Sequence, residues 1–546
     1  MKSLLLWLLI VVAVVLIAGA RLWLGYAMRT RVAAVIKEAA VQSERKAAKT
    51  TGPLPKGPLF SRGETYAFLD AAKRAEALVD PLQRCLAYPD PPHSHWAHDA
   101  VVAYCNYRNQ PIISFAEVKQ LVQSGHAAEL DRRFAQALDT QLTQPDAKGR
   151  LDRIFYADFH DGSFDIRPTL DAWKRQSPDS AFAYAASGYA YVQMAFAARG
   201  GKFMSKTPLS NVESMDRLAI EADADLKRAI ALNPRITPAY SEMIALGGLT
   251  FGRDYALSAA KRGLDAVPGD WDIYDQLMWL DEPKWGGSLI AMKELAREAQ
   301  THASRNPLLK LLLPEEALYR ADNCSCSGDV EFAAYSGALD QVASSGFLLD
   351  AGATGKDDGN PQMMAIYLSE ALRFNPGLDD ARINRVYALV EFDNAPWAIA
   401  EADHLLKASP GNEFAMKARA WAYLSINDLP HAQRDFLAAT ELDPSDMWAL
   451  ARLGGVYLDN GRQWDKAWDV ANRLIDRDPQ HVDGWLLRAG IQEYEPRSGL
   501  KETTDYIASH FRGNLRLNVV IARLQTAVAQ RERAKSGPGK ASASPN

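Results

Sequence analysis

Few stretches of the chain alternate apolar and polar residues with the period of two that is typical of β-strands. The first part of the chain after residue 63 instead has the pattern of helices, at residues 64–86, 95–107, 114–124 and 126–142. We therefore expect an almost wholly α-helical protein.

One apolar run near the amino terminus is long and free of charge. Residues 4–20 contain no charged side chain, and apolar residues resume after Arg21 as far as Met28. A helix of this length crosses the ~30 Å apolar core of a bilayer if Arg21 extends to the interface. The sequence predicts a transmembrane anchor, and a signal peptide cleaved after residues 18–20 (Ala-Gly-Ala) is the alternative.

The charges around this run give conflicting indications of its orientation. Lys2 precedes the run and seven basic residues follow it, which by the positive-inside rule favours a cytoplasmic bulk. The signal-like layout favours the opposite orientation. We expect a single span in a bacterial inner membrane, with the bulk of the chain periplasmic.

Prolines recur at similar spacings beyond residue 170. The intervals are 34, 39, 69, 34, 34 and 35 residues between Pro234, Pro268, Pro307, Pro376, Pro410, Pro444 and Pro479. A period of 34 is that of tetratricopeptide repeats, in which two antiparallel helices form a unit and a proline follows the second helix. The interval of 69 predicts an irregular repeat between Pro307 and Pro376.

Small and large apolar residues fall where such repeats need them. In the unit that ends at Pro444, Ala420 and Ala432 occupy the positions where the two helices cross, and Tyr423 and Phe436 fill the space between helices. The sequence predicts an all-α fold, namely an α-solenoid of tetratricopeptide-like helix pairs with an N-terminal transmembrane helix. The expected segments are an anchor (1–28), a stalk and linker (29–63), an N-terminal helical region (64–177), repeats with an insertion (178–307), irregular helical repeats (308–376), further repeats (377–511), a C-terminal capping helix (512–535) and a disordered tail (536–546).

Three short strings resemble a bacterial family, the domain of unknown function 4034. They are residues 171–174 (Asp-Ala-Trp-Lys), 177–181 (Ser-Pro-Asp-Ser-Ala) and 283–288 (Pro-Lys-Trp-Gly-Gly-Ser). The resemblance implies a helical domain beside tetratricopeptide repeats and a bacterial origin, and it implies no activity or cofactor. In the third string we expect Ser288 to cap the next helix and Trp285 to fill the seam between helices.

Composition excludes several classes of protein. A chain of 546 residues exceeds the usual size of a single hydrophobic core, so several domains or a repeat array are expected. With 62 Lys and Arg against 67 Asp and Glu the net charge is -5, so we expect no nucleic-acid partner.

Two polar clusters contain residue types that carry chemistry. His93, His95 and His98 are possible zinc ligands, but a turn and a helix start explain them better. Residues 158–165 combine three aspartates with His160, and a capped turn is the simpler interpretation. Catalytic, nucleotide and zinc-protease motifs are absent from the sequence, so we expect no cofactor, no metal and no enzyme. A cell-envelope enzyme with its site in residues 64–170 is the alternative function.

The four cysteines fit neither a disulfide scaffold nor a zinc finger. Cys85 and Cys105 lie in neighbouring predicted helices, and a bridge and two free thiols are equally compatible with the sequence. Cys324 and Cys326 allow no assignment.

The repeats suggest a membrane-anchored scaffold that binds a protein or peptide in its concave groove. Four positions of each first helix commonly face such a groove. These positions hold Ile383, Tyr387, Phe414, Lys417, Trp421, Trp448 and Leu458. Aromatic anchors contribute much of the binding energy at interfaces, so this pattern favours an extended or helical apolar segment as the ligand. The alternative is that some of these aromatic residues only pack between neighbouring repeats.

Overall fold

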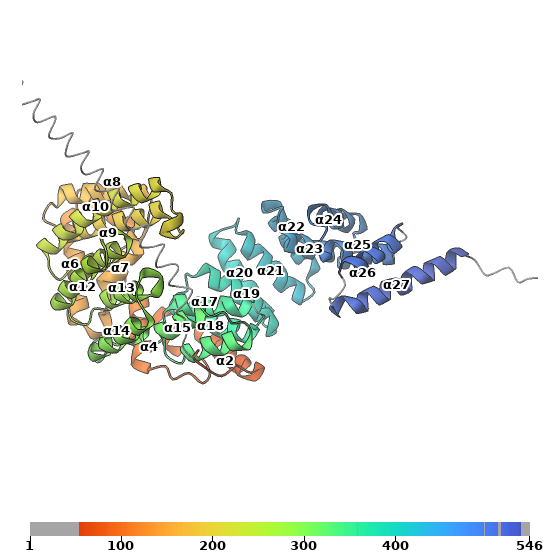
Figure 1. The fold of residues 1–546 in the computed structure, drawn as a ribbon, viewed down its shortest axis with the longest axis horizontal. Helices are drawn as coiled ribbons and strands as arrows, with labels where there is room; N and C mark the ends of the chain where they lie inside the picture. Colours follow the sequence, from red (N-terminus) through yellow and green to blue (C-terminus); the bar gives the residue numbers. More distant parts are fainter. Residues whose placement is uncertain (1–53, 358, 496, 512–514, 537–546) are drawn as a thin grey trace, which may run out of the picture. The chain divides into compact units, whose positions relative to one another are not determined.

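The computed structural model describes residues 54–357, 359–495, 497–511 and 515–536. Throughout these ranges the regular structure is helical, without a strand, which confirms the all-α prediction for them (Figure 1). The anchor (1–28), the stalk as far as residue 53 and the tail from residue 537 lie outside the described residues. No helix within the described ranges is long and apolar enough to span a bilayer.

The chain divides into two compact units. Unit 1 extends to Leu348 and includes residues 373–375, and unit 2 contains residues 349–372 and those from Pro376 onward. The helices of unit 1 are α2 (Arg62–Glu76), α3 (Pro81–Ala87), α4 (His98–Asn109), α5 (Phe115–Gln123), α6 (Ala127–Thr143), α7 (Arg150–Phe159), α8 (Arg167–Gln176), α9 (Ala181–Arg199), α10 (Leu209–Leu232), α11 (Thr237–Leu246), α12 (Arg253–Ala266), α13 (Trp271–Asp281), α14 (Leu289–Ala299), α15 (Glu315–Asp322) and α16 (Asp329–Ala338). Short helical turns lie between them: η1 (Pro145–Ala147), η2 (Phe164–Ile166), η3 (Met204–Lys206), η4 (Gly247–Phe251), η5 (Pro283–Trp285), η6 (Gln300–His302) and η7 (Pro307–Leu312).

Two helices include residues of both units, and the remaining helices belong to unit 2. The helices that include residues of both units are α17 (Ser345–Asp357) and α18 (Pro361–Phe374). Those of unit 2 are α19 (Asp379–Glu391), α20 (Ala395–Ala408), α21 (Glu413–Ser425), α22 (Leu429–Leu442), α23 (Met447–Asp459), α24 (Trp464–Arg477), α25 (Val482–Tyr494), α26 (Leu500–His510) and α27 (Leu515–Ser536).

The periodic prolines mark helix ends, as the sequence predicts. The residue before a proline is pushed out of the α conformation, so the helix stops one residue earlier. Six helices end in this way, each two residues before its proline: α10 before Pro234, α12 before Pro268, α18 before Pro376, α20 before Pro410, α22 before Pro444 and α24 before Pro479. The period therefore corresponds to real helix pairs.

One helix of the sequence analysis is wrong. Residues 64–86 form two helices, α2 and α3, because the side chain of Asp80 accepts the Gln83 N–H at 2.7 Å and Pro81 occupies the first helical position. The aspartate and proline together start a new helix. The other three helices expected in this region are present, with ends shifted by up to three residues.

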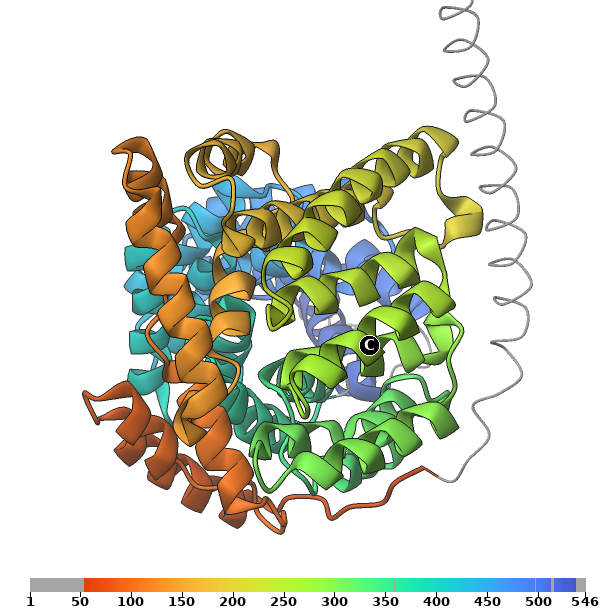
Figure 2. The ribbon, with the colours of Figure 1, turned by 90° about the vertical axis from the view of Figure 1, so that its left-hand side faces the viewer.

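The core of unit 1 is built around α9 and α10, which pack along most of their length (yellow in Figure 2). Gly188 makes this close approach possible, because a Cβ at this position would lie 2.7 Å from Leu226 Cδ2. Trp173 is fully buried against Phe134, and its indole N–H donates to Asp131. The Ser180 hydroxyl donates to the same carboxylate, so the first two family-like strings have a structural role.

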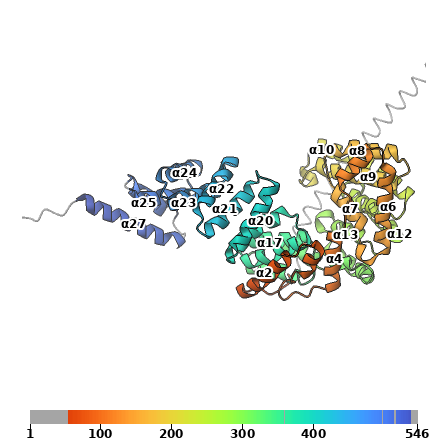
Figure 3. The same cartoon turned by 180° about the vertical axis from the view of Figure 1, so that it is seen from behind.

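The helix pairs of unit 2 follow one another along the chain (Figure 3). Ala420 and Ala432 are fully buried with Phe436 in one apolar cluster of the unit, which matches the predicted crossing of α21 and α22. The last helix, α27, packs on α25 and α26, with Leu524 in a second apolar cluster.

Candidate functional site

Three of the seven predicted groove residues come together in unit 2. The ring centroids of Trp421 and Trp448 are 6.0 Å apart, and those of Tyr387 and Trp448 are 6.3 Å apart. These residues lie on α19, α21 and α23, the first helices of successive pairs. Tyr387 and Trp421 are each the ninth residue of their helix, and Trp448, the second residue of α23, contacts both rings. We call Tyr387, Trp421 and Trp448 the aromatic strip.

The two indole rings differ in whether they pack on the apolar cluster of unit 2. Trp448 packs against the apolar cluster of unit 2 and lies 5.8 Å from the ring of Phe436. Trp421 is partly exposed and does not belong to the side chains packed on that cluster. Arg452 is exposed, and its guanidinium lies 5.3 Å from the ring centroid of Trp421 and 5.6 Å from that of Trp448. Trp421 is thus an accessible ring that a tryptophan and an arginine hold in place.

The remaining predicted groove residues have other surroundings. Lys417 is buried, and its Nζ lies 2.6 Å from Asp446 and 3.6 Å from Glu413, so its charge is already paired. Phe414 is 56% exposed. Leu458 packs on the apolar cluster, and Ile383 is half-buried.

Unit 1 contains a polar cluster that sequence reasoning missed. Gln141 Nε2 donates to Asp152 Oδ2 at 2.8 Å and lies 3.4 Å from Asp270 Oδ2. The Thr237 hydroxyl donates to the other oxygen of Asp152. These four buried side chains join α6, α7, α11 and the start of α13.

Further carboxyl groups continue from this junction along α11, α13 and α15. We call the whole set the acidic wall: Asp152, Glu242, Asp270, Asp272, Asp275 and Glu315. In the sequence only the three aspartates at 270–275 are close together, and the other acidic residues of the wall are far from them. No local motif therefore predicts the cluster.

Burial governs the acid–base behaviour of the wall. Loss of water, together with the charge of the nearby Asp272, raises the pKa of Asp270 and Asp275 from 3.8 to about 7. Burial also raises the pKa of Asp272, to about 6, and that of Glu242 well above its usual range. The carboxyl groups of the wall therefore release their protons at a higher pH than ordinary carboxyl groups do.

The histidines and acids of the N-terminal helical region do not form one site. His93 Nε2 lies 2.6 Å from Glu64, and His95 Nδ1 lies 2.6 Å from Asp340. No group of three His, Cys, Asp or Glu residues within the described ranges has the geometry of a metal site. Asp158 accepts the Phe115 N–H at 3.1 Å, and burial raises its pKa to about 7.

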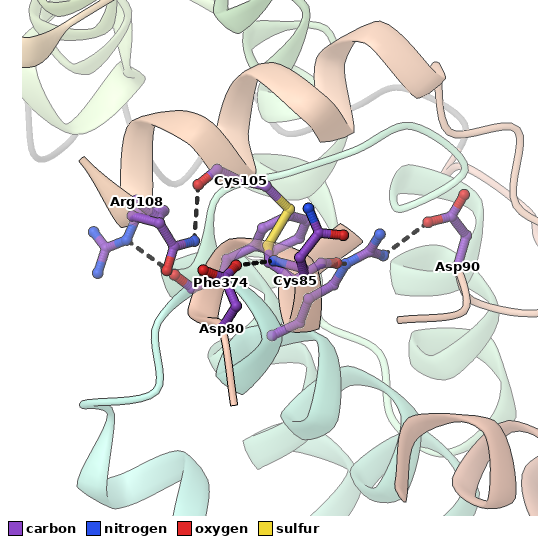
Figure 4. Close-up of a disulfide and its surroundings, with 9 residues drawn as sticks. Asp80, Cys85, Asp90, Cys105, Arg108 and Phe374 are labelled. Carbon is purple, nitrogen blue, oxygen red and sulfur yellow. Dashed lines mark hydrogen bonds and ion pairs between the residues drawn. A yellow bond between two sulfur atoms is a disulfide. The ribbon is translucent and has the colours of Figure 1, made fainter. Parts of the chain in front are cut away.

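The cysteines are bridged in both pairs. Cys85 and Cys105 are fully buried and form a disulfide that joins α3 to α4 (Figure 4). Next to it, Arg373 donates to the Cys85 carbonyl and pairs with Asp90. Cys324 and Cys326 form the second disulfide, so none of the four cysteines is free.

Comparison with known proteins gives neither a family nor a function. No protein-family model and no curated protein matches the chain, so the resemblance to the domain of unknown function 4034 gains no support. Among solved structures, a tetratricopeptide repeat protein from Parabacteroides merdae is 15% identical with a TM-score of 0.33, covering 47% of this chain and 98% of its own. Yeast Tom70 is 13% identical with a TM-score of 0.31, covering 76% of this chain and 96% of its own. Because these scores are low, the description of the helix pairs rests on the chain's own helix order and packing.

Proposed function

We propose that the chain is a scaffold that binds a protein or peptide through the aromatic strip. The observation that carries this proposal is the position of Trp421, a large apolar ring that is partly exposed and does not pack on the core. Accessible aromatic rings on a rigid surface lose little conformational freedom on binding and contribute large contact areas. The helix pairs supply that rigid surface.

The proposal also includes a membrane anchor and export of the bulk of the chain. The charge-free residues 4–20 support the anchor. The two disulfides support export, because structural disulfides form and persist in oxidising compartments outside the cytoplasm. They weigh against the orientation that the basic residues after the span favour.

Fusion of a reporter after Pro58 tests the orientation. We expect activity from an enzyme that folds only outside the cytoplasm. Activity from a cytoplasm-only reporter at the same junction would reverse the orientation and leave the binding proposal intact.

Partner capture tests the binding function itself. Full-length chain with Trp421→Ala should lose partners that the wild type retains after crosslinking in native membranes. Leu437→Ala is the matched control, because Leu437 is an exposed apolar residue on α22, the second helix of the same pair. Equal capture by both variants would contradict the proposal.

A further inference from the structure

Two cations lie at the two ends of the aromatic strip. The Lys356 Nζ, on α17, lies 5.6 Å from the ring centroid of Tyr387, and the Arg452 guanidinium lies over Trp421 and Trp448. Both cations are exposed. The contacts form a continuous series: Lys356, Tyr387, Trp448, Trp421 and Arg452.

These two cations differ from the other basic residues nearby in having no carboxylate partner within the described ranges. Lys356 donates to the neutral Asn384 Oδ1 at 2.9 Å, and the contacts of Arg452 are with the two indole rings. Lys417 and Arg419 instead pair with Asp446 and Asp435 at 2.6 Å. The strip therefore presents positive charge that no described carboxylate of unit 2 pairs with.

From this arrangement we infer that the partner segment is acidic, with an apolar or aromatic side chain between its carboxylates. The inference rests on the proposed function and defines the chemistry of its partner. The apolar side chain lies on Trp421, and carboxylates reach Arg452 at one end and Lys356 at the other. An arginine that already stacks on aromatic rings is ordered before the carboxylate arrives, so the new ion pair loses less side-chain entropy.

Charge complementarity selects against other segments. A basic segment would place like charges beside Arg452 and Lys356, which is unfavourable at an interface. A neutral apolar segment would gain the contact with Trp421 and would cover the two cations without compensation. Both should bind more weakly than an acidic segment.

Selection from a display library of random 12-residue peptides tests the inference. The bait is the full chain in detergent, as wild type, as the double variant Lys356→Glu with Arg452→Glu, and as Lys466→Glu. Lys466 is the matched control, since it is also exposed and lies 5.4 Å from the ring centroid of Tyr457, but on α24 outside the strip. A fourth bait, Trp421→Ala, reports on the strip itself.

We expect wild type and Lys466→Glu to enrich peptides that combine Asp or Glu with an aromatic or large aliphatic residue. The double charge variant should lose this preference and bind the selected peptides at least about tenfold more weakly. Binding by wild type should also weaken as salt is raised.

The other outcomes distinguish failure of the inferred acidic chemistry from failure of the proposed binding function. Enrichment of apolar peptides without acidic residues, or of basic peptides, would overturn the inferred chemistry while the aromatic strip remains a peptide site. Acidic enrichment that survives in the double charge variant would also overturn it. Failure of wild type to enrich any peptide beyond the Trp421→Ala bait would contradict both the inference and the proposed function.

Discussion

The indole ring of Trp421 on α21 lies 6.0 Å from that of Trp448 on α23, and the two rings share one arginine. Only Trp448 also packs on the apolar cluster of unit 2. Both rings are partly exposed, but only one is also part of the packing of the unit, so the two should respond differently to substitution.

Trp448→Ala should destabilise unit 2 by about 2–4 kcal/mol, because it removes a ring from the packed cluster. Trp421→Ala should cost less than about 1 kcal/mol, because the ring is partly exposed and off the cluster. Denaturant unfolding followed by circular dichroism measures both values. Equal costs would mean that Trp421 is a core residue and would remove the main support for the binding surface.

Ala432→Trp should destabilise unit 2 by about 1–3 kcal/mol or more. Ala432 and Ala420 are fully buried where α21 crosses α22, so the space between the helices cannot hold an indole ring. Ala408→Trp, at the exposed end of α20, is the control and should be nearly neutral. A melting midpoint unchanged by Ala432→Trp would contradict the observed crossing.

Unit 1 should become less stable as pH rises from about 4 to about 7. The pKa of Asp270 and Asp275 is about 7 in the folded chain and 3.8 ordinarily, so in this range the folded state binds protons that the unfolded state has released. The stabilisation is complete below the lower pKa and is lost as pH passes the higher one.

Thermal unfolding between about pH 5 and pH 8 measures this dependence. Asp275→Asn, which mimics the protonated carboxyl group, should make the pH dependence shallower. Asp254→Asn, at an exposed aspartate of α12, should leave it unchanged. Stability that increases across this range in the wild type would show that the wall is ionised in the folded protein.

Removal of the Cys85–Cys105 disulfide should destabilise unit 1 by about 2–4 kcal/mol, since the bridge closes a loop between cysteines that are 20 residues apart. In a reducing agent, the variant Cys85→Ala with Cys105→Ala should have the same stability as wild type. Without a reducing agent, the variant should be less stable than wild type. Replacing Cys324 and Cys326, which are 2 residues apart, should have a smaller effect. Identical stability of both proteins in oxidising buffer would mean that the buried cysteines are not bridged.

The sequence predicts the repeat architecture because its signals are local. A proline controls the residue before it, so the helix ends at Pro410 and Pro444 follow from the printed sequence. A local signal also explains the one incorrect helix. Asp80 and Pro81 start a new helix within a stretch whose apolar pattern is otherwise that of one continuous helix.

The parts that the sequence does not predict depend on distant residues. Asp152 and Asp270 lie close together because both contact Gln141 in the folded chain. The local sequence around either aspartate does not predict this contact. The pairing of Lys417 with Asp446 likewise needs two successive repeats. Counting positions from the repeat pattern therefore selects both the partly exposed Trp421 and Lys417, whose side chain is buried in an ion pair.

Site-specific photocrosslinking tests the central claim most directly. A photoreactive phenylalanine analogue replaces Trp421 in one full-length chain and Leu437 in another, and both are irradiated in native membranes. The account predicts a discrete crosslinked partner from position 421 and none from position 437. The absence of an adduct at position 421, or the same adducts from both positions, would contradict the assignment of the aromatic strip as the partner-binding surface.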